Sequence, residues 1–123
     1  MKIDLSYKFK ELIEYINNEK PFSPEFAIIL GSGLGEFASS VTVVKSISTA
    51  DLPGYPPSTV EGHSGRIIFA QANNKKLLLF KGRIHLYEGY KIYECILPVF
   101  ITYKLNCNKF YSVYDAQLLN LNQ

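Results

Sequence analysis

The stretch Ala27–Phe37, AIILGSGLGEF, is a short apolar run that ends abruptly in a glycine-rich segment. An apolar run of strand length followed by such a turn predicts a buried strand that leads into a loop. Glycines let the backbone turn sharply and approach an anion closely, and the amides of the loop and of a following helix supply positive dipoles. Ser32 adds a hydroxyl donor. Taken alone, the stretch fits a phosphate-binding loop and a tight strand-to-helix turn without a ligand equally well.

Two well-known phosphate loops do not fit this stretch. A P-loop has Lys followed by Ser or Thr after its last glycine, and Glu36 and Phe37 stand there instead. The dinucleotide-binding fingerprint needs a glycine where this sequence has Glu36. An NAD-binding domain is therefore disfavoured.

Composition is that of an ordinary globular domain. The chain has 123 residues, with 47% hydrophobic and 20% charged residues, which is enough for one domain with a real core. A formal net charge of +2 is too small to indicate a nucleic-acid or membrane partner. Cys95 and Cys107 form no metal-binding spacing, and we expect two reduced thiols. With a charged N-terminal segment that is no signal peptide, the sequence predicts a soluble cytoplasmic protein.

Apolar periodicity and turn residues predict short elements of an α/β fold. The expected elements are helices over 5–16, 34–41 and 91–105, strands over 26–30 and 41–47, a proline- and glycine-rich loop over 51–65, and a hairpin of 66–71 and 76–81. Asn73 and Asn74 favour the hairpin turn because asparagine tolerates the left-handed region. Pro98 should kink the last helix or mark the start of its regular part.

Two further clusters carry residues suited to an anion. His63 lies between glycine-containing turns in EGHSGR, where it could donate to phosphate or simply be a solvent-exposed loop histidine. In KGRIHLYEGY, strand alternation would place Arg83, His85 and Tyr87 on one face. A guanidinium binds phosphate with two parallel hydrogen bonds. The alternative for this cluster is a polar, solvent-facing strand edge.

The three clusters occur in an order that resembles one known protein family. The segments AIILGSGLG, GYPPSTVEGHSGR and FKGRIHLYEGY, in this order, closely resemble the trimeric-type purine nucleoside phosphorylases from about residue 24 to 109. The related methylthioadenosine phosphorylases carry other versions of the histidine and arginine segments. The resemblance implies an α/β fold with a mixed β-sheet flanked by helices, of which this chain would hold an incomplete part.

The resemblance also implies roles for individual residues. Phosphate would be bound by Ser32, His63, Arg83, the Ile84 backbone and His85, of which His85 would also be catalytic. Tyr87 would pack on the ribose, and a flap with Pro56, Pro57 and His63 would cover the site. The implied reaction is phosphorolysis of a purine nucleoside to the free base and pentose 1-phosphate, with inorganic phosphate as co-substrate and no metal or organic cofactor. The family assembles as a homotrimer.

The resemblance to the family ends at about residue 109. We expect a single partial domain in which residues 1–109 are family-like and 110–123 form a divergent tail that has neither the family's apolar strand nor its two glycines. Residues that read the purine base are missing, so purine specificity cannot be read here. We therefore expect an inactive, poorly soluble chain from a truncated or frameshifted gene. The alternative is a non-catalytic phosphate- or nucleoside-binding module, or a partner of a complete phosphorylase.

Overall fold

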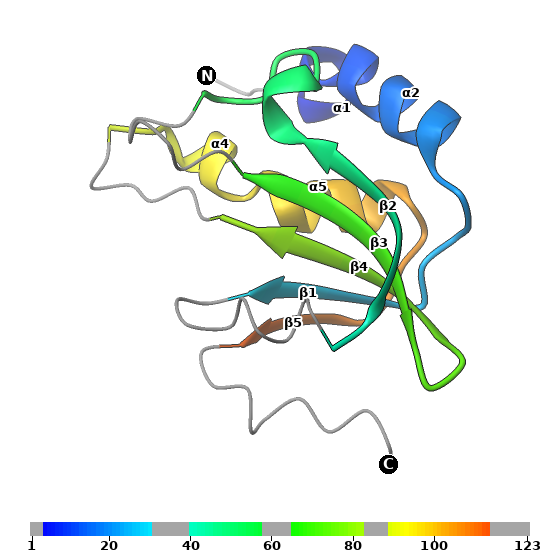
Figure 1. Cartoon of the computed structure of the whole chain (residues 1–123). Coiled ribbons are helices and arrows are strands. Elements are labelled where there is room, and N and C mark those ends of the chain that lie inside the picture. The colour runs from blue at the N-terminus through cyan, green and yellow to red at the C-terminus, as the bar shows by residue number, and fades with distance from the viewer. Residues whose placement is uncertain (1–3, 31–39, 58–64, 83–88, 114–123) are drawn as a thin grey trace.

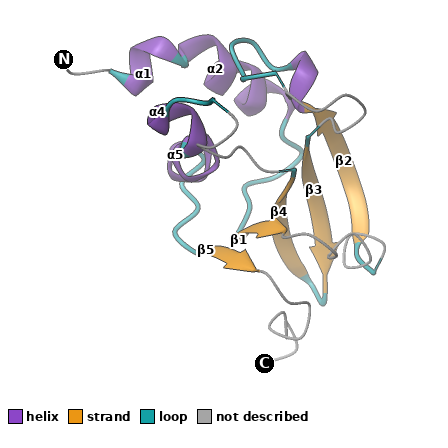
Figure 2. Cartoon of the chain, turned by 90° about the vertical axis from the view of Figure 1, so that its left-hand side faces the viewer, coloured by secondary structure: helices purple, strands orange, loops and turns teal. Residues whose placement is uncertain are grey.

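The computed structural model describes residues 4–30, 40–57, 65–82 and 89–113. A five-stranded sheet forms one layer, and its strand order is β2-β3-β4-β1-β5. The strands are β1 (Phe26–Leu30), β2 (Thr42–Ser48), β3 (Arg66–Ala72), β4 (Lys75–Lys81) and β5 (Phe110–Val113). The helices are α1 (Leu5–Lys8), α2 (Lys10–Glu19), α4 (Ile92–Cys95) and α5 (Leu97–Lys104), with a 3₁₀ turn, η1, at Thr49–Asp51. The described helices lie on one side of the sheet (Figures 1 and 2).

The sheet is mixed because β1 pairs parallel to both of its neighbours, β4 and β5. The other pairs, β2 with β3 and β3 with β4, are antiparallel. β1 is the apolar run AIIL and its preceding Phe26, and its central place explains why it lacks the polar alternation of a half-exposed strand. This arrangement confirms the predicted α/β class with a mixed sheet flanked by helices.

The β3–β4 hairpin confirms the predicted asparagine turn. Ala72 pairs with Lys75, so Asn73 and Asn74 form a two-residue loop. Their φ angles are 50° and 64°, which is the left-handed backbone that a type I′ turn requires at both central positions. The strands follow the prediction closely, since β4 begins one residue earlier than expected and β3 extends by one residue to Ala72.

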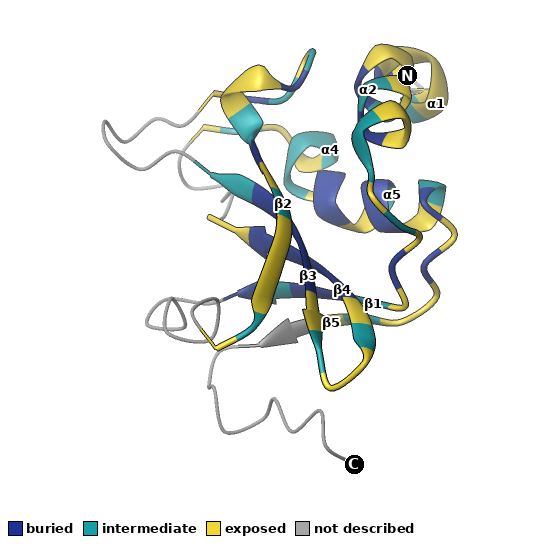
Figure 3. Ribbon diagram, turned by 45° about the vertical axis from the view of Figure 1, so that its right-hand side comes forward, coloured by how far each residue is buried: buried dark blue, intermediate teal, exposed yellow. Residues whose placement is uncertain are grey.

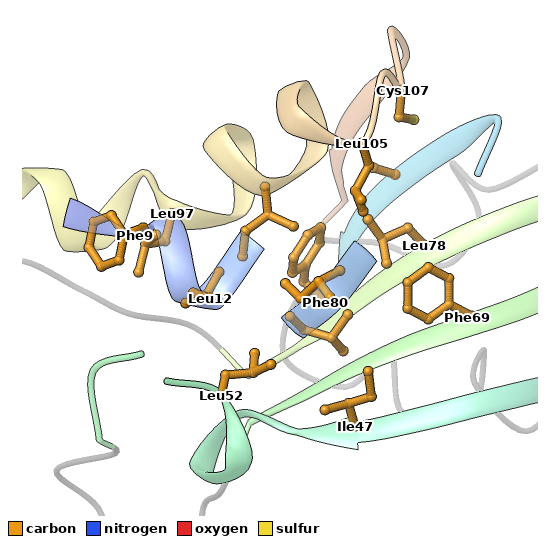
Figure 4. Close-up of a cluster of buried hydrophobic side chains, with 14 residues drawn as sticks. Phe9, Leu12, Ile47, Leu52, Phe69, Leu78, Phe80, Leu97, Leu105 and Cys107 are labelled. Atoms are coloured by element: carbon orange, nitrogen blue, oxygen red, sulfur yellow. The ribbon is translucent and has the colours of Figure 1, made fainter. Parts of the chain in front are cut away.

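Side chains of β4 alternate between two apolar clusters. Leu78 and Phe80 point toward the helices and pack with residues of α2 and α5, as Figure 4 shows for Leu12 and Leu97. Leu77 and Leu79 point to the other face, where they form a second buried cluster to which no described helix contributes. Both faces of β4 are buried, as expected for a strand inside a sheet.

The predicted terminal helices are present but interrupted. The first is split at Phe9, a buried residue with a non-helical φ of −110°, and it runs through Asn17 and Asn18 to Glu19 instead of ending before them. The last helix is split at Ile96, and Pro98 lies in the first turn of α5, where its missing N–H costs nothing. Pro98 thus marks the start of the regular helix. No described helix is long and apolar enough to span a membrane.

The expected divergent tail begins with a strand that the sequence analysis did not identify. Phe110–Val113 forms β5, which pairs parallel to β1 with Ala27 opposite Phe110 and Leu30 opposite Val113. Four residues with a serine among them give a weak strand signal, and the pairing surface offered by β1 decides the structure. Because β5 covers this side of β1, the central strand has no open edge. The predicted helix over 34–41 lies almost wholly outside the described residues.

The hairpin turn generates a stability prediction. Replacing Asn74 (φ 64°) by valine should lower the free energy of unfolding by about 1–2 kcal/mol, because a β-branched residue is strained in the left-handed region. Asn74→Gly, which accepts this backbone freely, should change stability little. Urea unfolding followed by far-ultraviolet circular dichroism measures both variants. Equal stability of the valine and glycine variants would contradict the turn conformation.

Candidate functional site

Three strand ends meet at one edge of the sheet. The parallel strands β1 and β4 both finish there, with Leu30 opposite Lys81. The antiparallel strand β3 begins there, with Arg66 opposite Lys81. Three neighbouring strands therefore present their ends side by side (Figure 1). In open α/β sheets, ligands bind outside the carboxyl ends of parallel strands, which here are the ends of β1 and β4.

The residues predicted to bind phosphate and ribose follow or precede these strand ends in the sequence. They are Ser32, His63, Arg83, Ile84, His85 and Tyr87, and all of them lie outside the described residues. Ser32 comes two residues after the end of β1, and Arg83 two residues after the end of β4. His63 comes three residues before the start of β3. The described structure thus brings together the attachment points of all three predicted motifs.

A close backbone approach fixes two of these attachment points. Gly82 has a φ of 93°, and a Cβ atom placed on it would lie 3.0 Å from the Cα atom of Gly65. The Gly65 carbonyl accepts two hydrogen bonds from Thr49, one from its backbone N–H at 3.0 Å and one from its hydroxyl at 3.2 Å. A side chain on Gly82 would push these backbones apart. Glycine at this position is therefore a packing requirement as well as a conformational one.

A second contact joins the same two segments at their other ends. The Tyr90 hydroxyl donates a hydrogen bond to the Pro57 carbonyl. Pro57 directly precedes residues 58–64, and Tyr90 follows residues 83–88 closely. The chain portions that carry His63 and Arg83 are therefore tied together at both ends, by Gly65 with Gly82 and by Pro57 with Tyr90.

Tyr55 lies beside this second contact. Burial, together with a smaller contribution from repulsion by Tyr90, raises the pKa of the Tyr55 phenol to about 12. The Tyr55 side chain is thus a neutral phenol at all ordinary pH values. Pro56 is buried next to it, so the described end of the predicted flap is packed against the protein.

Two cations lie at the strand ends. Arg66 and Lys81 are register partners on β3 and β4, and within the described residues neither forms an ion pair. The Arg66 Nε atom donates to the Ser46 hydroxyl at 2.7 Å, which holds the guanidinium at this edge. Positive charge without a paired carboxylate attracts anions. Sequence reasoning did not select these two residues, because only the register shows that they are neighbours.

The described residues offer no alternative metal site, since no three His, Cys, Asp or Glu side chains gather among them. Cys107 is buried, and burial raises the pKa of its thiol, which donates a weak hydrogen bond to the Lys109 carbonyl at 3.5 Å. This thiol is a structural group remote in sequence from the predicted motifs.

Comparison with known proteins decides the family. The chain is 36% identical over 90 residues to purine nucleoside phosphorylase 1 of Geobacillus stearothermophilus and 32% identical over 100 residues to the purine nucleoside phosphorylase of Rattus norvegicus. The chain belongs to the purine nucleoside phosphorylase family. These alignments include 73% and 80% of this chain but only 33% and 35% of the two relatives. No family model matches the sequence.

Solved structures of purine nucleoside phosphorylases share the fold. The enzyme of Schistosoma mansoni in complex with acetate superposes with a TM-score of 0.80 at 31% identity, covering 88% of this chain and 40% of that one. A purine nucleoside phosphorylase in complex with ribose 1-phosphate gives a TM-score of 0.74 at 32% identity, covering 87% and 39%. The chain therefore spans about a third to two fifths of the length of the phosphorylases it matches.

The Gly65–Gly82 contact predicts a difference between two glycine substitutions. Gly82 and Gly89 have nearly the same φ, 93° and 92°, but a Cβ atom on Gly89 meets nothing within 4 Å. Both alanine variants carry the same backbone strain, and only Gly82→Ala adds a clash. Gly82→Ala should therefore lower the free energy of unfolding by about 1–3 kcal/mol more than Gly89→Ala. Urea unfolding of the two variants tests this, and equal losses would disprove the close approach.

The raised pKa of Tyr55 predicts a loss of stability in alkali. The folded chain keeps this phenol protonated up to pH about 12, whereas the unfolded chain ionises it near pH 10. Between these values the unfolded state binds fewer protons, so stability falls as pH rises through the window. Tyr55→Phe should make this fall shallower than in the wild type, measured by urea unfolding from pH 9 to about 12. Tyr7→Phe, which removes an exposed phenol, is the control, and identical slopes in the wild type and Tyr55→Phe would refute the assignment.

Proposed function

We propose that this chain supplies the phosphate-binding edge of a purine nucleoside phosphorylase. The proposed reaction cleaves a purine nucleoside with inorganic phosphate and yields the free base and ribose 1-phosphate. The supporting observation is the convergence of β1, β3 and β4 at one edge, because the three predicted motifs are attached to neighbouring strand ends. Inorganic phosphate is a co-substrate in this proposal, and no metal or organic cofactor takes part.

Phosphate would be held by a set of donors of different kinds. We assign to it the Ser32 hydroxyl, the His63 and His85 imidazoles, the Arg83 guanidinium and the Ile84 backbone. A guanidinium both binds and orients an oxyanion, because it donates two parallel hydrogen bonds. Arg66 and Lys81, which form no ion pair within the described part of the chain, support this assignment with positive charge at the strand ends.

The chemistry follows from the position of the anion. A phosphate oxygen forms a bond to the anomeric carbon of the ribose while the bond from that carbon to the purine nitrogen breaks and its electron pair leaves with the base. The sugar gains oxocarbenium character in the transition state, and a phosphate dianion held beneath it stabilises that charge. Holding the nucleophile in place also removes an entropic barrier. We place Tyr87 against the ribose and give His85 the catalytic role beside the phosphate.

The proposal also includes the oligomeric state, the metabolic role and the cellular compartment of the protein. We propose a homotrimer that works in purine salvage in the cytoplasm, and both points rest on the family resemblance. The second candidate function is a phosphate- or nucleoside-binding module without turnover. It has the same structural support, because strand ends that converge at one edge would serve phosphate binding with or without turnover.

Phosphate titration of the chain tests the assignment. Arg83→Ala should weaken phosphate binding roughly 10- to 100-fold, as expected for loss of a hydrogen-bonded charge worth about 1.5–3 kcal/mol. Isothermal titration calorimetry measures the affinity, and Lys10→Ala, which removes an exposed cation on α2, should leave it unchanged. An assay of hypoxanthine release from inosine in the presence of phosphate distinguishes the two candidate functions. Release supports the phosphorylase, and phosphate binding without release supports the binding module. Absence of phosphate binding by the unsubstituted chain would overturn both.

A further inference from the structure

The outer face of α4 and α5 carries an exposed apolar stripe. Ile92, Ile96, Val99 and Tyr103 follow one another at intervals of four, three and four residues, which is the spacing of one helix face, and they run from α4 across the break at Ile96 into α5. Their exposed fractions are 69%, 43%, 49% and 73%. Figure 3 shows the mixture of buried and exposed residues along α5. We call these four residues the α4–α5 stripe.

The composition of α5 is that of a helix buried on all sides. Its sequence, LPVFITYK, has one charged residue, Lys104, at its end. Leu97 and Ile101 fill the core side, but Val99 and Tyr103 face outward without cover among the described residues. A helix that is apolar around its whole circumference is normally enclosed by protein. The sequence of α5 thus indicates a second packing partner.

α2 provides the internal comparison, since it lies in the same helical layer. Its core side is formed by Leu12 and Ile16, and its outer side carries exposed Glu11, Glu14 and Asn17. This is the ordinary pattern of a helix with one buried face and one face in water. The two helices bury their inner faces alike, and only α5 keeps an apolar outer face.

Positive charge flanks the α4–α5 stripe. The Lys91 and Lys8 Nζ atoms lie 5.7 and 5.2 Å from the ring centre of Tyr93, at the start of the stripe. At the other end, the Lys104 Nζ atom lies 5.6 Å from the ring centre of Phe100. The nearby Glu94 carboxylate accepts a hydrogen bond from the Lys91 backbone N–H at 2.9 Å and so caps α4. A partner with acidic residues beside its apolar stripe would complement these cations.

A second copy of the chain is a poor match. Antiparallel pairing of two α4–α5 stripes, with Ile92 opposite Tyr103 and Ile96 opposite Val99, would bring Lys91 of one copy against Lys104 of the other. Like charges opposed across an interface disfavour it. We therefore propose that the α4–α5 stripe docks an amphipathic helix whose apolar residues are flanked by aspartate and glutamate. This surface is separate from the strand ends of the phosphate site and does not depend on the proposed function.

Two synthetic peptides test this proposal on the full chain. Each has about 18 residues, or five helical turns, with leucine at heptad a and d positions, and its flanking positions are all glutamate or all lysine. Fluorescence anisotropy should show that the glutamate peptide binds at least roughly tenfold more tightly than the lysine peptide. The double variant Val99→Ser with Tyr103→Ser should lose this binding by at least roughly tenfold. Tyr7→Ser, at an equally exposed tyrosine outside the stripe, is the control and should bind as the wild type.

Several results of these binding measurements would contradict the docking proposal. Equal binding of the two peptides, no binding of the glutamate peptide, or undiminished binding to the double variant would each overturn the proposal. Analytical ultracentrifugation measures whether the wild type and the double variant self-associate. Self-association of the wild type that the double variant abolishes would assign the stripe to a second copy of the chain and would also overturn it. Circular dichroism confirms that the variants, which change only exposed positions, are folded.

Discussion

The parallel pairing of β1 with β4 is the interaction on which the rest of the structure depends. It sets Leu30 beside Lys81, and the antiparallel hairpin then sets Arg66 beside Lys81. A shift of one residue in this register would exchange the side chains that β1 presents to the two sides of the sheet and misalign the strand ends. β1 resists such a shift because its two faces join different buried clusters, with Ala27 in one and Ile28 in the other.

Two contacts between described residues hold the ends of the segments that carry the predicted binding residues. Gly65 and Gly82 bring two strand ends together without side chains between them, and Tyr90 joins Pro57 by a hydrogen bond. Such contacts fix the described ends of the two segments relative to each other. Cationic Arg66 and Lys81 add a field of the right sign for an anion.

Local patterns in the sequence predicted what local physics controls. The apolar run of β1 and the turn at Asn73 and Asn74 were predicted at the right places, because burial length and left-handed backbone leave clear residue signatures. β5 was missed because its pairing with β1 supplies most of its stability. The nearness of Arg66 to Lys81 was missed for the same reason: it depends on strand register, which no single segment encodes. The assigned ligand residues remain predictions.

The two-residue turn between β3 and β4 has a consequence for the order of folding. Closing so short a loop costs little chain entropy, and hairpins form on a time scale of roughly 1–10 microseconds. β1 must instead find β4 across a long intervening segment, and β5 can add only after β1 is in place. Contacts distant in sequence form slowly. We therefore expect the hairpin to form before the parallel half of the sheet, and the strand ends of β1, β3 and β4 to be aligned only once β1 has paired with β4.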